Sequence, residues 1–234
     1  FFFFTQKTAY ELRPRDWSSD VCSSDHHIFF VYIASHESDT IVSLLTPIRG
    51  NLQNLFKLTR LTLISTPPSI DDQSLACITS LRYLHVLSNS ISNSSVSLLT
   101  NLEVLEVSSK NITDDGISML FNLREITAAA GAHDRGVSCL TNLQVLNLFN
   151  DEKITDDGII CLSGLTQLSV NKKNSNSGIA HLKNLRFLNI SRAGPLLSPD
   201  VIDHLPLLET ITHIPSSRKE KWREKALPRY IMMK

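Results

Sequence analysis

Two pairs of adjacent carboxylates occupy corresponding places in the sequence, Asp114–Asp115 and Asp156–Asp157, each within the hexapeptide ITDDGI. Paired carboxylates could bind Ca²⁺, but such a site needs roughly six to eight oxygen ligands. The two copies start 42 residues apart, which puts the pairs in separate structural units. Thr and Asp are also residue types that cap the N-terminus of a helix, and the negative charge of Asp interacts favourably with the positive end of the helix dipole. We therefore predict helix capping here, not metal binding.

Cysteine and histidine form a second set of candidate ligands. Cys139, Cys161, His181 and His204 follow one another at intervals of 20 to 23 residues. Four such ligands would suit zinc, but every one must come within about 2.3 Å of the ion. Their spacing assigns them to four successive helices, and packed helices lie about 8–10 Å apart. We predict a half-buried column on the helices, no metal and no cofactor.

Catalytic motifs are missing from the sequence. It contains no GxGxxG, GxxxxGK[ST], HExxH or GxSxG, the patterns that position phosphates, zinc or a nucleophile. Ser, His and Asp are plentiful, yet no spacing groups them. We predict that the protein is not an enzyme.

The elements that carry these residues follow from a repeated pattern of apolar residues, L-x-x-L-x-x-L-x-L. Its second positions recur at intervals of 20 to 23 residues, and they are Leu58, Leu81, Leu102, Leu123, Leu143, Leu165, Leu185 and Leu208. The closing L-x-L points alternate side chains inward from a short strand. One unit alone cannot bury that stripe, so neighbouring units must stack. ITDDGI then starts a short helix, in which Ile117 and Leu120 share a buried face and Gly116 or Gly158 loosens the first turn.

This pattern resembles the leucine-rich repeat family over residues 52–215. Repeats that contain the ITDDGI motif resemble most closely the cysteine-containing and F-box-associated variants of the family. The resemblance implies an α/β solenoid of about eight units, with parallel strands on the concave face and short helices on the convex face. The chain departs from the family at the position after the strand where an asparagine is usual. We align that position with Thr66, Lys110, Gly131 and Lys173.

The flanking segments differ from the repeats. Residues 1–25 resemble the translation of a sequencing-adapter remnant, so we expect a non-native segment, or else a disordered tail, and a start lost before His26. Residues 26–50 read as a degenerate repeat or N-terminal cap, with a helix over Thr40–Leu45. The solenoid is expected over residues 51–215. Residues 216–234 carry seven Lys/Arg against two Glu and predict a basic C-terminal cap or tail.

Composition sets outer bounds on function. The 234 residues have no net charge, and residues 26–215 carry only about −4, which predicts neither nucleic-acid nor membrane binding. Four cysteines without a CxxC motif indicate reduced thiols, and we predict an intracellular protein, cytoplasmic or nuclear. No apolar run reaches the ~18 residues of a membrane helix.

The outward residues of each strand are the candidate binding residues, because solenoids bind along their concave face. Those selected are Tyr83, His85, Val104, Glu106, Glu125, Val145, Asn147, Phe149, Gln167, Phe187 and Asn189. Val145, Phe149 and Phe187 could share an apolar patch at the centre of an interface. An equally good interpretation is that these are ordinary surface residues without a binding role.

These observations predict a non-catalytic scaffold that binds a protein partner, as a monomer or within a hetero-complex. The resemblance implies a substrate-receptor part of a ubiquitin ligase, although no F-box is visible in the sequence. Alternatives are a ligand-sensing or immune-type repeat protein, and a repeat fragment of a larger enzyme whose catalytic domain lay upstream.

Overall fold

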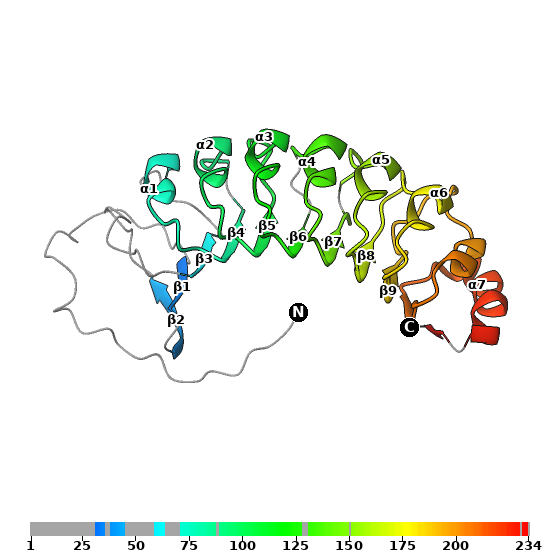
Figure 1. Cartoon of the computed structure of the whole chain (residues 1–234). Coiled ribbons are helices and arrows are strands. Elements are labelled where there is room, and N and C mark those ends of the chain that lie inside the picture. The colour runs from blue at the N-terminus through cyan, green and yellow to red at the C-terminus, as the bar shows by residue number, and fades with distance from the viewer. Residues whose placement is uncertain are drawn as a thin grey trace, which may run out of the picture.

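The computed structural model describes residues 31–35, 38–44, 59–63, 71–87, 89–127, 131–149, 151–229 and 231–233. Short strands line the inner side of an arch and short helices line its outer side (Figure 1). The strands are β1 (Val31–Ser35), β2 (Ser38–Leu44), β3 (Arg60–Leu63), β4 (Tyr83–Val86), β5 (Val104–Val107), β6 (Glu125–Thr127), β7 (Val145–Asn147), β8 (Gln167–Ser169), β9 (Phe187–Asn189), β10 (Thr210–Thr212) and β11 (Met232–Met233). The helices are α1 (Asp72–Ala76), α2 (Asn93–Val96), α3 (Asp114–Ile117), α4 (Asp134–Ser138), α5 (Asp156–Ile159), α6 (Asn176–Ile179), the 3-10 turns η3 (Pro199–His204), η4 (Ser216–Arg218) and η5 (Leu227–Arg229), and α7 (Lys219–Ala226).

One sheet runs the length of the arch. Strands β3 to β10 pair in parallel and in sequence order, one strand for each predicted unit. The predicted repeat solenoid with parallel strands and short outer helices is therefore confirmed. At the N-terminal end, β1 pairs antiparallel with both β2 and β3. The helix predicted over Thr40–Leu45 is wrong, since β2 extends through Leu44; its β-branched Thr, Ile and Val favour a strand.

A continuous apolar stripe fills the space between the sheet and the helices. In the unit around β5, the framework residues Leu99, Leu102 and Leu105 are fully buried and Val107 is 2% exposed. The equivalent residues that the structure describes are buried in the following units as far as Ile211 of β10, where the pattern ends at the exposed His213. The first two framework leucines, Leu55 and Leu58, lie outside the described residues. Each buried leucine contributes about 1.5–3 kcal/mol relative to an exposed one, so stacking supplies the stability that a single unit lacks.

The aspartates at the helix starts bond to the next unit along the solenoid, not only to their own helix. Asp156 is the first residue of α5, and its Oδ1 accepts a hydrogen bond from the backbone NH of Ser175 in the following unit (2.9 Å). Asp134 accepts from the backbone NH of Thr155 in the same way (2.7 Å). Within its own helix, Thr155 is the N-cap and accepts from the NH of Asp157. The expected capping by Thr is confirmed in this unit and wrong in the first ITDDGI copy, where the side chain of Thr113 makes no capping hydrogen bond to α3. The first aspartate joins units together.

Side chains of the same kind make this bond in six consecutive units. The acceptors are Asp72, Asn93, Asp114, Asp134, Asp156 and Asn176, and the backbone donors are Ser92, Thr113, His133, Thr155, Ser175 and Ser198. We call this row the helix-start ladder. It ties each helix to its neighbour on the outer side of the arch, as the sheet does on the inner side.

In two loops that follow strands, the buried polar residue is not the one that the sequence alignment placed at the asparagine position. Lys110 and Lys173 are exposed, and the buried residues are their neighbours Ser109 and Asn171. Asn171 donates from Nδ2 to the carbonyl of Ile154 (2.8 Å) and accepts from the backbone NH of Lys173 (2.6 Å). The asparagine position was therefore placed too late in both loops.

The C-terminal residues cover the last unit. Trp222 of α7 is 1% exposed, and β11 pairs in parallel with β10. Arg229 donates to the carbonyls of Ile202 and Leu205 near the end of η3. This basic segment uses its cations to satisfy backbone carbonyls that the last unit would otherwise present to solvent.

Candidate binding face

All the candidate residues except Phe149 lie in two columns across the strands on the inner side of the arch. The first column runs through Tyr83, Val104, Glu125, Val145, Gln167 and Phe187, and the second through His85, Glu106, Thr127, Asn147, Ser169 and Asn189. Their side chains are exposed or half-buried, while the residues between them are buried. Because the register holds across six strands, these residues make one continuous surface, here called the concave face.

A network of polar contacts occupies the N-terminal part of the concave face. The hydroxyl of Tyr83 donates to Oε1 of Glu106 (3.0 Å), and the Arg60 guanidinium stacks 4.4 Å from the centre of the Tyr83 ring. Nδ1 of His85 lies 3.9 Å from Oε2 of Glu106. Contacts between three strands hold these side chains in place, so this end of the face is pre-organised for a partner.

Negative charge accumulates next to this network. Partial burial and the nearby carboxylate of Glu106 together raise the pKa of Glu125 above its ordinary value. Burial, followed by the interaction with Glu106, raises the pKa of Tyr83 to about 12. Two neighbouring carboxylates thus share a partly desolvated surface, which favours a cationic group of a partner.

Two asparagines of the face have structural bonds. Oδ1 of Asn147 accepts from the backbone NH of Phe149 (3.1 Å), and Oδ1 of Asn189 accepts from that of Ser191 (3.0 Å). Each side chain closes the turn that follows its strand. Only the side-chain NH₂ groups of Asn147 and Asn189 remain as donors to a partner.

The strand register does not place Phe149 next to Phe187, so Val145, Phe149 and Phe187 do not form the single apolar patch that was expected. Phe149 lies beyond the end of β7, where the Arg192 guanidinium stacks 4.8 Å from its ring centre. Phe187 starts β9, beside Gln167 and Thr210. Two strand spacings and four residues separate the backbone positions of Phe149 and Phe187, roughly 16 Å. The rings are 38% and 40% exposed and form separate anchors on opposite sides of the face.

Two arginines that were not among the selected residues also belong to the face, Arg60 and Arg192. Each stacks on an aromatic ring of the face from a neighbouring strand or loop. The repeat alignment places Arg60 in the first column, and the register agrees, because Arg60 pairs with Tyr83. Arg192 follows β9 by three residues, and no periodic signal marks it.

The cysteine–histidine column lies at the helix ends and is exposed. Cys139, Cys161, His181 and His204 are all exposed, so the half-buried positions expected for them are wrong. Helices α4, α5 and α6 have only four or five residues, and η3, which ends at His204, has six. The column falls at or just after the last turn of each. Among the described residues, no group of three or more His, Cys, Asp or Glu side chains could hold a metal ion.

Comparison with solved structures identifies the architecture. An internalin (inlF) from Listeria monocytogenes is 23% identical, with a TM-score of 0.53 over 75% of this chain and 51% of that chain. Internalin C2 from the same organism is 21% identical, with a TM-score of 0.55 over 79% of this chain and 82% of that chain. The fold is a leucine-rich-repeat solenoid. The chain spans about half the length of the first of these proteins.

A further match is to the crystal structure of the Rad7 and Elc1 complex in yeast. It is 21% identical, with a TM-score of 0.38 over 64% of this chain and 41% of that chain. No protein-family model matches the sequence, and no curated protein matches it. Within the described part of the chain, no helix is both long enough and apolar enough to cross a membrane.

Proposed function

We propose that this leucine-rich-repeat chain is a non-catalytic module that binds a protein partner on its concave face. The observation that carries the proposal is the pair of outward columns, which presents a pre-organised acidic end around Glu106 and Glu125 and an aromatic anchor at Phe187. A partner that fits places a basic group over the two carboxylates and an apolar side chain against Phe187.

Affinity capture with the full chain, read by cross-linking mass spectrometry, tests the proposal. The double variant Glu125→Lys/Phe187→Ala changes both ends of the face, and both side chains are exposed or half-buried. The matched control is Glu224→Lys/Leu227→Ala at the C-terminal segment, where both residues are exposed. We expect a protein whose cross-links map to the concave face, retained by the control and lost with the double variant. Retention by both variants would overturn the proposal.

A substrate-receptor role in a ubiquitin ligase is the finer proposal, and it rests on the ITDDGI style of the repeats. It predicts that capture recovers other ubiquitin-ligase subunits. Recovery of small-molecule ligands or of extracellular immune partners would favour the sensing alternative. Neither result would require catalysis by this chain.

A further inference from the structure

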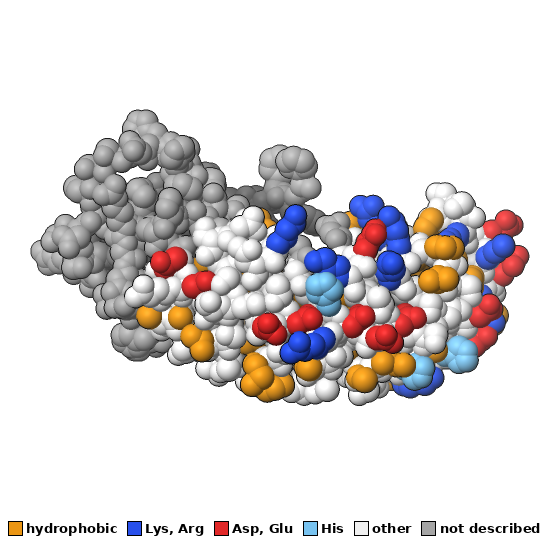
Figure 2. All heavy atoms as spheres, turned by 90° about the horizontal axis from the view of Figure 1, so that it is seen from above, with side chains coloured by type: hydrophobic (Ala, Val, Ile, Leu, Met, Phe, Trp, Pro, Cys, Tyr) orange, Lys and Arg blue, Asp and Glu red, His pale blue; other side chains and the backbone are white. Residues whose placement is uncertain are grey.

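A row of large apolar side chains is exposed away from the concave face. Leu98, Met119 and Phe121 are 52%, 55% and 52% exposed, and they come from two consecutive units. Apolar side chains gather along the lower edge of the view in Figure 2. We call Leu98, Met119 and Phe121 the flank row.

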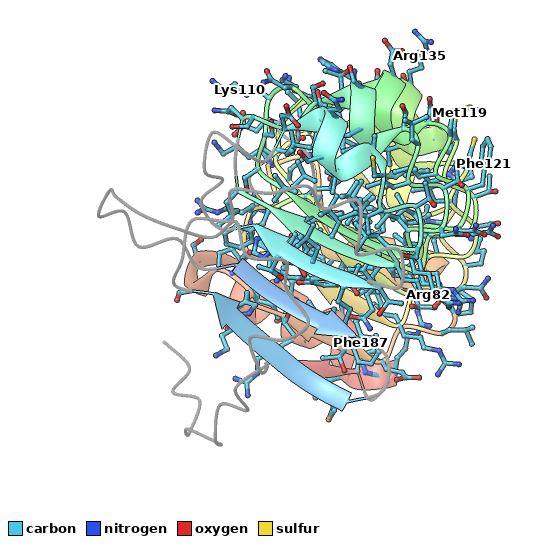
Figure 3. The ribbon with its side chains drawn as sticks, turned by 90° about the vertical axis from the view of Figure 1, so that its left-hand side faces the viewer. Arg82, Lys110, Met119, Phe121, Arg135 and Phe187 are labelled. Carbon is cyan, nitrogen blue, oxygen red and sulfur yellow. The ribbon has the colours of Figure 1, made fainter. Side chains whose placement is uncertain are left out.

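The flank row lies where each helix turns back towards its strand. Met119 follows the C-cap of α3, Ser118, and precedes the buried Leu120. The shortness of the helix leaves Met119 and Phe121 outside the core on either side of that leucine. In Figure 3, Met119, Phe121 and Arg82 emerge on one side of the solenoid, Lys110 on the opposite side, and Phe187 below. The row therefore belongs to a surface separate from the concave face.

A groove runs beside the flank row. It has a volume of about 440 Å³ and is lined by Arg82, Asn101, Glu103, Asn122, Arg124, Asn142 and Gln144. These residues come from the segments that lead into β4, β5, β6 and β7. Four strands about 4.8 Å apart give a length of roughly 14 Å, which fits about four to five residues of extended chain.

Most polar groups of the groove already have partners within the protein. The amides of Asn101, Asn122 and Asn142 donate to the carbonyls of Thr79, Thr100 and Phe121 in the preceding units, at 2.9, 2.9 and 2.8 Å. These bonds fix the asparagine side chains at the floor of the groove. Each bond uses one of the two NH donors of the side-chain amide. They leave the side-chain oxygen atoms as acceptors.

Arg124 is the charged group of the groove without a partner. Arg82 forms an ion pair with Glu103 (2.7 Å), and these two charges cancel. Among the described residues, no carboxylate or carbonyl accepts from the exposed Arg124 guanidinium, which lies between Glu103 and Gln144 in the stack of units. The groove therefore carries one net positive charge, and a guanidinium binds a carboxylate through two parallel hydrogen bonds.

We propose that the flank row and this groove bind an extended peptide segment of a protein partner, with apolar side chains on one side and a carboxylate for Arg124. Apolar side chains of the segment cover Leu98, Met119 and Phe121, and its acidic side chain neutralises the groove. Burying exposed apolar area provides affinity, and the carboxylate provides selectivity. This surface is independent of the partner on the concave face.

The test measures fluorescence anisotropy of labelled hexapeptides with the full chain. One peptide alternates leucine with glutamate, a second alternates leucine with lysine, and a third alternates leucine with serine. We expect the leucine–glutamate peptide to bind at least about tenfold more tightly than the other two. Equal binding of all three, or no binding of the leucine–glutamate peptide at millimolar concentration, would overturn the proposal.

Variants locate the binding. Arg124→Glu should weaken the leucine–glutamate peptide at least about tenfold and strengthen the leucine–lysine peptide. Met119→Ser/Phe121→Ser should weaken both. The controls are Lys110→Glu, an exposed cation on the opposite side, and Leu227→Ser, which is 71% exposed on the C-terminal segment. If the controls reduce binding as much as the flank variants do, the site is elsewhere. Melting curves check that each variant is folded.

Discussion

The backbone of Gly158 lies so close to Asp134 that a Cβ atom on the glycine would stand 2.5 Å from Oδ1 of the aspartate. The same relationship joins Gly136 to Asp114 and Gly178 to Asp156, at 2.6 and 2.4 Å. The glycine of the ITDDGI motif thus makes room for the helix-start side chain of the unit before it, the Asp134 carboxylate at Gly158 and the Asn93 amide at Gly116. That side chain is part of the helix-start ladder, so the two features of the motif serve one contact between units.

Gly158→Ala should destabilise the solenoid by about 1–3 kcal/mol, the usual cost of forcing an extra methyl group into a packed site. The new methyl group displaces Asp134 from the NH of Thr155. Chemical denaturation measures the loss. Gly164→Ala is the matched control, because its Cβ would meet its nearest neighbours at 3.4 and 3.5 Å, ordinary contact distances. A Gly158→Ala variant as stable as this control would contradict the role given to the glycine.

Asp134→Ala should cost about 1–3 kcal/mol, because the half-buried NH and hydroxyl of Thr155 lose their acceptor. Asp134→Asn should be close to neutral. Asn93 already performs the same task with an amide, accepting from the NH of Thr113 (2.8 Å) and donating to its hydroxyl (2.7 Å). Denaturation of the two variants side by side separates hydrogen bonding from charge. Equal destabilisation by both would mean that the charge matters.

The solenoid was predictable because its signal is periodic and local. The spacing of Leu81, Leu102 and Leu123 fixes both the unit length and the buried face, and the strand register follows from it. The contact between Gly158 and Asp134 could not be predicted in this way. Its two residues lie in different units, and only the coil brings them together. The expectation that glycine merely loosens the helix was therefore incomplete.

The sequence predicted which residues lie on the concave face better than it predicted which of them contact one another. The alternation of each strand placed Tyr83 and Glu106 correctly on the outward side, because register alone decides this. Whether two outward side chains meet depends on their column, and Phe149 and Phe187 were expected to meet from strand spacing alone. Met119 precedes Leu120 as Cys139 precedes Leu140, so it belongs to the same column, which was expected to be half-buried. Its exposure was missed, since helix length decides it and no repeat pattern gives that length.

Trp222→Ala should destabilise the C-terminal end by about 3–5 kcal/mol, the cost of removing a fully buried large side chain. The effect should be local, because each unit contacts mainly its neighbours. Hydrogen exchange followed by mass spectrometry should therefore show faster exchange in β9 and β10 and little change in β4 and β5. Arg223→Ala, an exposed neighbour on α7, is the control. Uniform loss of protection along the whole chain would contradict a local cap.

Glu125→Gln should stabilise the protein at pH 7 by about 0.5 kcal/mol or less, in the range of surface substitutions. The folded state raises the pKa of Glu125, mainly through burial and then through Glu106. The charged form is therefore penalised in the folded state, and the wild type loses stability as the pH rises through the raised pKa.

The gain from Glu125→Gln should be largest above that raised pKa. It should vanish as the pH falls to the ordinary glutamate value and below, where the carboxyl is protonated in both states. Urea unfolding between pH 3 and pH 8 measures the difference, with Glu224→Gln on the exposed side of α7 as the control. A gain that grew towards low pH would have the opposite sign and would show that the carboxylate is stabilised by the concave face.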